Sequence, residues 1–442
     1  MTADHSDKLA RSQYLTKRLH ELVPGGAHTY AKGDDQYPEG MAPVISHGHG
    51  AHVWDVDGNR YIEYGAGLRS VSLGHAHPRV LAGVRRELDR GSNFVRPSVV
   101  EVEAAQRFLA TVPTADMVKF AKNGSDATTA AVRLARAATG RPLVALCRDH
   151  PFFSTDDWFI GTTPMSAGIP EVIGNLTVRF PYGQLTATED LLRQHAGQVA
   201  CLVLEAATAQ EPPPGYLAGM RELADVYGCV LVFDEMITGF RWSEAGAQGY
   251  YGVTPDLSTF GKALGNGFAV SALAGRRELM ELGGPNATGE RAFLLSTTHG
   301  AETHSLAAAM AVMDTYRSEG IAQRLHDLGE RLAAGVREVA AGMNVAEHVV
   351  VKGRPSNLVF ATLDHHGHPS QDYRTLFLRQ LVAGGVLGPS FVVSSALTHE
   401  DIDRTIDVVA QACAVYRKAL DAEDPAAWMG GRPVRPALRR RG

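Results

Sequence analysis

The sequence predicts an α/β protein in which a large domain with a mostly parallel sheet is joined by a smaller α+β domain. Short apolar segments alternate with helical patterns from about residue 76 onward, which favours the large domain. A chain of 442 residues also exceeds what one hydrophobic core usually organises. We expect an N-terminal segment at 1–75, a large domain at 76–329 and a C-terminal part at 330–442, with the two outer segments forming the small domain.

The first predicted element is a β-hairpin near residues 52–64. In "HVWDV" (52–56) and "RYIEY" (60–64) apolar and polar residues alternate, and "DGN" between them is typical of a turn. This pattern predicts a small antiparallel unit that precedes the large domain.

The large domain is predicted to contain a helix at 123–140. Small or apolar residues recur there at helical spacing: Ala127, Ala130, Ala131, Leu134, Ala135 and Ala138. Ser125 is placed to cap this helix and Gly140 to end it.

Three wholly apolar segments are predicted to be buried parallel strands. They are "LVALC" (143–147), "VACLVLE" (199–205) and "CVLVFDE" (229–235), and a helical pattern at 215–228 separates the last two. Because ligands of such sheets gather at the carboxyl ends of the strands, we look for the site there.

The C-terminal part shows helical patterns at 331–343 and 399–420 and a strand pattern at 357–363. These predict a second α+β unit.

Composition narrows the function classes. The formal net charge of −5 gives no basic footprint for nucleic acid. No run of 18 apolar residues predicts a membrane span, and the charged N-terminus does not resemble a signal peptide. The four cysteines lie far apart without a CxxC motif. We therefore expect a cytoplasmic protein with no nucleic-acid or membrane partner.

Lys262 stands in the small-residue segment "DLSTFGKALGNG". A solvated turn lysine is the more common reading of such a position. The alternative is a desolvated amine that forms a Schiff base with a carbonyl cofactor. Asp234 ends a buried strand, where a carboxylate either serves a turn or faces a ligand. Glu235, the neighbouring carboxylate, is an alternative to Asp234.

Two further segments are suited to a phosphate. Gly124 and Ser125 lie in the first turn of the predicted helix, where unpaired N–H groups attract anions, although a plain helix cap is the commoner reading. "LSTTHGAETHSLAAAMA" (295–311) places hydroxyl groups before another helix. Together, an anion site, a carboxylate and a lysine are the parts needed to hold pyridoxal 5′-phosphate.

Histidines gather in "HGHGAH", "HAHP" and "HHGH", but none is arranged as HExxH or with a carboxylate at helical spacing. We therefore predict no metal site, and a zinc hydrolase is a distant alternative.

The chain resembles the class III (subgroup II) pyridoxal-phosphate aminotransferases, and most of all their glutamate-1-semialdehyde 2,1-aminomutase branch. The motifs that carry the resemblance are "DVDGNRYIEY", "LGHAHP", "NGSDATTAAVRLARAATGR", "LVFDEMITGFR" and "TFGKALGNG", in the family's order. The resemblance runs from about residue 23 to 403. It implies fold type I, with a mixed, mostly parallel seven-stranded sheet, and a homodimer with shared active sites.

The resemblance also implies roles around the cofactor. Lys262 matches the internal-aldimine lysine and proton carrier, and Asp234 matches the partner of the pyridinium nitrogen. Met236 matches a residue that packs on the ring, and Gly124 and Ser125 match the phosphate site.

Three more positions are matched around the cofactor. Phe152 takes the place of the family's ring-stacking tyrosine, with Phe153 or His150 as alternatives. Thr298 matches a threonine that reaches the phosphate in the neighbouring subunit. Glu205 matches an acidic position close to the cofactor.

The substrate side departs from the aminomutases. Lys32 replaces their carboxylate-binding arginine, "GLRS" introduces Arg69 in place of a tryptophan-containing stretch, and valines replace a glutamate in "GPSFVVSSALTHED". Tyr30, Lys32 and Arg69 are the predicted substrate-binding residues. A wider set of candidates adds His28, Asn93 and Arg96.

These departures favour an aminotransferase that acts on a small polar substrate of the amino-sugar or aminoglycoside type, as in antibiotic biosynthesis, together with an amino donor. The alternative is an aminomutase, epimerase or dehydratase acting on a related amino-bearing substrate. A cofactor-bound but catalytically silent binding protein is the competing hypothesis from another class.

Overall fold

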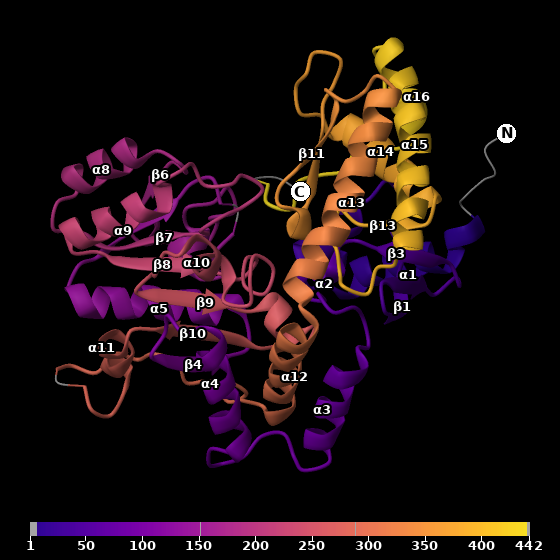
Figure 1. The fold of residues 1–442 in the computed structure, drawn as a ribbon. Coiled ribbons are helices and arrows are strands. Elements are labelled where there is room, and N and C mark those ends of the chain that lie inside the picture. The colour runs from indigo at the N-terminus through magenta and orange to yellow at the C-terminus, as the bar shows by residue number, and fades with distance from the viewer. Residues whose placement is uncertain (1–6, 151, 288, 440–442) are drawn as a thin grey trace. The chain divides into compact units, whose positions relative to one another are not determined.

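The computed structural model describes residues 7–150, 152–287 and 289–439, which fold into two compact units. One unit contains the described parts of residues 1–67, 72–77 and 324–442. The other contains residues 68–71 and the described parts of 78–323. Figure 1 shows the elements of both.

The second unit is built on a seven-stranded sheet (Figure 1). In sheet order its strands are β4 (Met117–Ala121), β10 (Ser271–Gly275), β9 (Leu257–Phe260), β8 (Val230–Asp234), β7 (Val199–Leu204), β5 (Leu143–Cys147) and β6 (Thr177–Phe180). β9, β8, β7, β5 and β6 pair in parallel, whereas β10 runs antiparallel to both of its neighbours. The predicted mixed, mostly parallel sheet is confirmed.

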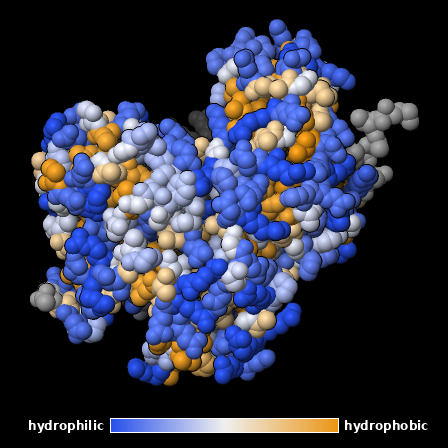
Figure 2. All heavy atoms as spheres, in the orientation of Figure 1, coloured by the Kyte–Doolittle hydropathy of each residue, from blue (hydrophilic) through white to orange (hydrophobic). Residues whose placement is uncertain are grey.

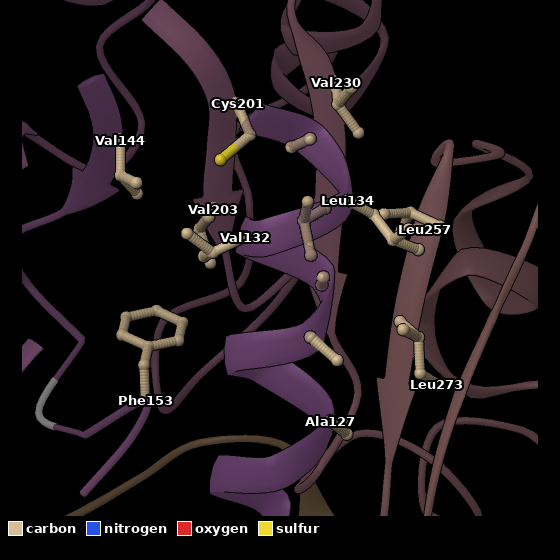
Figure 3. Packing of buried hydrophobic residues seen from close by; sticks show 14 of the residues in the cluster. Ala127, Val132, Leu134, Val144, Phe153, Cys201, Val203, Val230, Leu257 and Leu273 are labelled. Carbon is tan, nitrogen blue, oxygen red and sulfur yellow. The ribbon is translucent and has the colours of Figure 1, made fainter. Parts of the chain in front are cut away.

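Both faces of this sheet are covered, which explains why its strands are wholly apolar. Val144 and Leu146 of β5 share a buried cluster with the alanines and Leu134 of α5 (Gly124–Thr139), and Figure 3 shows α5 among these side chains. Leu143, Ala145 and Cys147 of the same strand point to the other face and join the cluster that includes α8 (Leu185–Gln194) and α9 (Tyr216–Tyr227). The period-2 alternation of a strand therefore supplies two cores.

Further helices of this unit surround the sheet. They are α3 (Pro78–Leu88), α4 (Val99–Thr111), α6 (Asp157–Ile160), α7 (Glu171–Gly174), α10 (Gly246–Tyr251), α11 (Arg277–Met280) and α12 (Thr303–Glu319). α3 packs closely on α12: a Cβ added at Gly83 would lie 3.4 Å from the carbonyl oxygen of Ala307.

The helix predicted at 123–140 forms, but Ser125 does not cap it. The N-cap is Asn123, whose side chain accepts a hydrogen bond from the Asp126 N–H at 3.1 Å while the Asp126 carboxylate accepts one from the Asn123 N–H. This reciprocal capping box satisfies two N–H groups, and Ser125 lies inside the first turn instead. Gly140 ends the helix in the left-handed conformation, as predicted.

Four strands of the seven-stranded sheet were not predicted individually: β4, β6, β9 and β10. β9 has a direct bearing on the site, because it ends at Phe260, two residues before Lys262. β9 is only four residues long and carries Ser258 and Thr259, so an apolar-run criterion does not detect it.

The first unit contains a four-stranded sheet in the order β1 (Ile45–His49), β2 (His52–Asp55), β3 (Arg60–Glu63) and β13 (Val386–Leu387). β2 and β3 form the predicted hairpin. A two-stranded sheet joins β11 (Val349–Lys352) and β12 (Val359–Thr362). The helices are α1 (Ala10–Leu22), α13 (Ile321–Gly342), which begins in the second unit, α14 (Gln371–Ala383), α15 (His399–Asp421) and α16 (Ala426–Met429). A short helical turn, α2 (Ala66–Arg69), crosses the boundary between the units along the chain.

The face in Figure 2 is mostly hydrophilic, with hydrophobic residues in small groups. Among the described residues, no helix is long and apolar enough to cross a membrane. The four cysteines (Cys147, Cys201, Cys229 and Cys413) are all buried free thiols.

The capping of α5 gives a first test. We expect Asn123→Ala to lower the free energy of unfolding by about 1 kcal/mol, because the Asp126 N–H loses its acceptor. Asn123→Asp, which can still accept that bond, is the control and should cost less. Denaturant titration of both variants measures the difference. Equal losses for the two variants would contradict the assignment of the cap.

Candidate active site

Lys262 follows the carboxyl end of β9 and begins a short 3₁₀ turn, η5 (Lys262–Gly265). Its backbone φ is +43°, in the left-handed region that non-glycine residues seldom adopt. The residue as a whole is half-buried, but burial lowers the pKa of its amine. The negative charges of Asp234 and Glu205 oppose this shift in pKa. The amine thus lies in a desolvated place among charged groups.

Asp234 is the last residue of β8 and is 2% exposed. Its Oδ1 accepts hydrogen bonds from the Met236 N–H at 2.9 Å and from Thr259 Oγ1 at 3.3 Å. Burial raises the pKa of Asp234 to about 6, although Lys262 and these hydrogen bonds lower it. Near pH 7 the group is therefore mainly a carboxylate, held by one oxygen beside the lysine.

Glu205 directly follows β7 and is 5% exposed. Burial and the nearby charge of Asp234 raise its pKa to about 8, against the opposing effects of Lys262 and Arg69. Its backbone N–H donates to His150 Nδ1 at 3.0 Å. Strands β7, β8 and β9 thus deliver Glu205, Asp234 and Lys262 to one edge of the sheet, where α/β proteins bind ligands.

Glu235, the alternative to Asp234, is fully buried but serves the fold. Its carboxylate accepts hydrogen bonds from the Ala247 and Gln248 N–H groups, at 2.8 Å each, and from the Thr238 hydroxyl. Because Ala247 and Gln248 lie in the first turn of α10, Glu235 satisfies donors that a helix leaves unpaired. Its acceptor capacity is used within the fold, which leaves Asp234 as the carboxylate beside Lys262.

Gly124 and Ser125 form the first turn of α5, as the phosphate hypothesis requires. Ser125 Oγ accepts a hydrogen bond from the Thr155 N–H at 2.9 Å. Met236, which is 5% exposed, lies against this turn: a Cβ added at Gly124 would be 3.1 Å from its Sδ, and one at Gly261 would be 2.6 Å away. The two glycines let Met236 pack between the helix start and the segment that carries Lys262.

The three aromatic candidates for the ring-stacking position differ in exposure. Phe152 is 45% exposed, whereas Phe153 is 2% exposed and belongs to the core that includes α5. His150 is buried, and burial lowers its pKa to about 4, so its imidazole is neutral near pH 7. Of the three side chains, that of Phe152 is the one open to a ligand.

Thr298 is exposed in a turn before α12, and its carbonyl accepts a hydrogen bond from Asn93 Nδ2 at 3.1 Å. Arg96 is also exposed. The structure places Asn93 and Thr298 together, away from direct hydrogen bonding to Lys262 or Asp234.

The substrate-side candidates are divided between the units. Arg69 lies in the second unit, and its positive charge is near enough to Lys262 to lower the pKa of the amine. Tyr30 and Lys32 belong to the first unit, where both are exposed on a 3₁₀ turn, η3 (Tyr30–Lys32), and His28 is exposed just before it. Their relation to the lysine stays a prediction.

The sequence reasoning missed Arg241 and Thr259. Arg241 is 1% exposed, lies four residues after Ile237 and donates to its carbonyl at 2.9 Å. Its place in the quoted motif "LVFDEMITGFR", in the turn that follows a buried strand, was the signal available for it. Thr259 lies on β9, the strand that the sequence analysis did not detect.

Among the described residues, no group of three or more His, Cys, Asp or Glu side chains is arranged to hold a metal ion. The arrangement that does exist is an amine of lowered pKa, two buried carboxyl groups and a helix start suited to a phosphate. This set is suited to covalent amine chemistry.

Comparison with known proteins points the same way. A family model described as aminotransferase class-III matches residues 35–387. The chain is 34% identical over 439 residues to a glutamate-1-semialdehyde 2,1-aminomutase of Roseiflexus castenholzii, covering 93% of this chain and 99% of the relative.

Two solved structures have the same fold. An omega-transaminase from Sphaerobacter thermophilus superimposes with a TM-score of 0.82 at 26% identity, covering 91% of this chain and 96% of that one. The FumI protein of Sphingopyxis sp., solved with its pyridoxal phosphate, has a TM-score of 0.85 at 24% identity, covering 95% and 100% of the two chains.

The role assigned to Glu235 is testable at Gly246. This glycine has φ +82°, and a Cβ there would lie 2.4 Å from Glu235 Oε2. Gly252 also has a positive φ, +67°, but open space around its Cβ position. We expect Gly252→Ala to cost about 1 kcal/mol of stability and Gly246→Ala at least about 2 kcal/mol more, since only the latter displaces the buried carboxylate. Equal losses in denaturant titrations would show that Glu235 does not need this position.

Proposed function

The chain belongs to the class III aminotransferase family, and we propose that it transfers an amino group to or from a small polar substrate of the amino-sugar or aminoglycoside type. Enzymes of this family use pyridoxal 5′-phosphate, which is accordingly the cofactor of this chain. The observation that carries the proposal is the cluster at the sheet edge, where the Lys262 amine has a lowered pKa beside Asp234 and Glu205. A solvated turn lysine would have no such surroundings.

The residues present fit this cofactor. Lys262 would hold it through Nζ, Asp234 would pair with its ring nitrogen, and Gly124 and Ser125 would bind its phosphate at the start of α5. Met236, packed between Gly124 and Gly261, is placed to support the ring.

The remaining cofactor assignments concern the edges of the site. Phe152 would stack on the ring, which its exposed side chain allows. Glu205 would lie close to the cofactor. Thr298 would reach the phosphate in the partner subunit of a homodimer, and its exposure in one subunit supports this assignment.

When bound, pyridoxal phosphate supplies an aldehyde that accepts amino groups and a ring that delocalises the electron pair left at the substrate carbon. The chain supplies the proton transfer. Burial lowers the pKa of Lys262, so a larger fraction of its Nζ is unprotonated near neutral pH and can take a proton. Asp234 provides a fixed negative charge, and the bonds from Met236 and Thr259 keep its orientation.

On the substrate side, we propose Tyr30, Lys32 and Arg69 as binding residues. The exposed Tyr30 and Lys32 offer a hydroxyl and a point charge rather than a bidentate fork, which suits a hydroxylated substrate better than a carboxylate. These two groups support an amino-sugar substrate, as in antibiotic biosynthesis. The dispersed cysteines, all free thiols, support a cytoplasmic enzyme.

A second candidate is an aminomutase, since the curated relative at 34% identity carries that name. An epimerase or dehydratase would use the same groups up to the last proton transfer. These alternatives need no separate amino donor, and this difference separates them from the aminotransferase.

The test is the visible absorbance spectrum of the purified holoenzyme before and after L-glutamate, L-glutamine or L-alanine is added. An aminotransferase loses the visible cofactor band with one of these donors and forms pyridoxamine phosphate. A band that persists with every donor but changes with amino-bearing sugars would favour the alternatives. No visible band at all after cofactor is added would overturn the proposal.

Lys262→Ala should lower kcat by at least about 10³-fold, because both the covalent attachment and the proton carrier are lost. The variant should still bind cofactor non-covalently. Lys119→Ala, which removes an exposed lysine of β4, is the control and should keep full activity. Dialysis and steady-state assays measure both properties. More than a tenth of the wild-type rate in Lys262→Ala would contradict the assignment.

The charge of Asp234 predicts a pH dependence. Because its pKa is raised to about 6, the carboxylate is lost as the pH falls through 6, and the affinity of the apoenzyme for the cofactor should fall with it. Asp234→Asn should bind about 10- to 100-fold more weakly at pH 7.5 and lack this step. Titration of apoenzyme with cofactor between pH 5 and 8 measures both curves. Parallel curves would assign the pH dependence to another group.

A further inference from the structure

The helical turn that contains Arg69 is left-handed. Ala66, Gly67, Leu68 and Arg69 have φ values of +44°, +56°, +59° and +70° and together form α2. Four consecutive positive values make this a left-handed helical turn. Three of its residues are not glycine, and the described part of the chain contains nine non-glycine residues with positive φ in all.

Such a turn does not form without support. The left-handed conformation brings Cβ close to the following carbonyl oxygen, so each non-glycine residue adds a cost. Strain of this kind persists only where the surrounding structure enforces it, and it gathers at functional sites. The contacts that hold the turn are therefore informative.

The side chains of Glu63 and Arg241 hold the backbone of this turn. Near its start, Glu63 Oε1 accepts a hydrogen bond from the Gly67 N–H at 3.1 Å. At its end, the Arg241 guanidinium donates through Nη2 to the Arg69 carbonyl. Glu63 is itself held, because its Oε2 lies 2.9 Å from His75 Nε2.

Of these two residues, Arg241 gives the stronger evidence that the turn is held for a purpose. It is almost fully buried, and its two hydrogen bonds reach backbone carbonyls, those of Ile237 and Arg69, while its Nε has no partner. Among the described residues, no carboxylate forms an ion pair with it. Burying a guanidinium is costly, so its fork must do something that a neutral side chain cannot. What it does here is fix two carbonyls at a set separation.

Arg69 is the side chain that this arrangement presents. Burial lowers the pKa of Arg69, the charge of Glu205 opposes that shift, and Arg69 in turn lowers the pKa of Lys262. The Arg69 guanidinium is thus close enough to the Lys262 amine for the two charges to interact. A planar fork at such a place matches a carboxylate, which accepts two parallel hydrogen bonds.

We propose that Arg241 is a positioning residue that holds 66–69 in the left-handed conformation, so that Arg69 receives the carboxylate of the amino-acid donor. This inference rests on the aminotransferase function proposed above. It assigns the carboxylate of the donor to Arg69. Tyr30 and Lys32 then bind the hydroxylated, amino-sugar-type substrate.

The positioning role is tested by rescue. Arg241→Lys keeps the charge but cannot bridge two carbonyls, and we expect it to raise the KM for the carboxylated donor about 5- to 10-fold with a smaller change in kcat. Adding Leu68→Gly, which removes the strain at residue 68, should restore KM to within about twofold. Adding Leu68→Ala removes the same side chain but leaves the strain, and should not restore KM. Equal effects of glycine and alanine would overturn the positioning role.

If Arg241→Lys does not fold, Leu68→Gly and Leu68→Ala in the wild-type background still test whether the left-handed turn forms. Leu68→Gly should leave donor kinetics unchanged and be more stable to heat than Leu68→Ala. The opposite order of stability would show that the left-handed turn does not form.

The ligand is tested with two donors, L-glutamate or whichever amino acid bleaches the wild type, and isopropylamine, which has no carboxylate. Arg69→Met should raise the KM for the amino acid about 10- to 100-fold, the loss expected for a charge-assisted pair, and change that for isopropylamine less than threefold. Arg69→Lys should lie between the two. Equal losses with both donors would overturn the assignment of Arg69. A wild type that responds to no donor would instead refute the aminotransferase function itself.

Discussion

The site depends on an amine held where water cannot fully solvate it. Lys262 has a lowered pKa because protein surrounds its amine. The negative charges of Asp234 and Glu205 act in the opposite direction and favour the protonated amine. The parallel strands make this possible, since β7, β8 and β9 end at one edge and each delivers one of the three groups. The two apolar cores on either face of the sheet keep those strand ends in place.

Backbone strain gathers around the same groups. Three residues near these groups have positive φ: Lys262, Arg69 and Phe240. Lys262 and Arg69 are themselves charged, and Phe240 directly precedes Arg241. The fold offsets these costs through rigid neighbours: Phe240 is fully buried between the rings of Phe260 and Tyr316. The charged groups are thus set at fixed places before any ligand binds, which is how preorganised sites reduce the reorganisation that a reaction needs.

Much of this could be predicted from the sequence, for identifiable reasons. Apolar runs revealed β5, β7 and β8 because both faces of those strands are buried, and helical spacing with Gly140 revealed α5. β9 escaped because it is short and partly polar. The sequence predicts Ser125 as the cap because serine is a common cap, whereas in the structure Asn123 Oδ1 accepts the hydrogen bond from the Asp126 N–H. The left-handed turn and the contact of Arg241 with Arg69 are long-range, since residues 69 and 241 meet only in the folded chain. The family resemblance, which is confirmed, came from motif order rather than from any single residue.

Attachment of the cofactor to Lys262, and to no other lysine, can be tested directly. Borohydride reduction of the holoenzyme fixes the bond between the cofactor and the amine to which it is attached, and proteolysis followed by mass spectrometry then locates it. We expect the modification on the peptide containing "FGKALGNG", at Lys262. Modification of a different lysine, or of several lysines equally, would overturn the role assigned to Lys262.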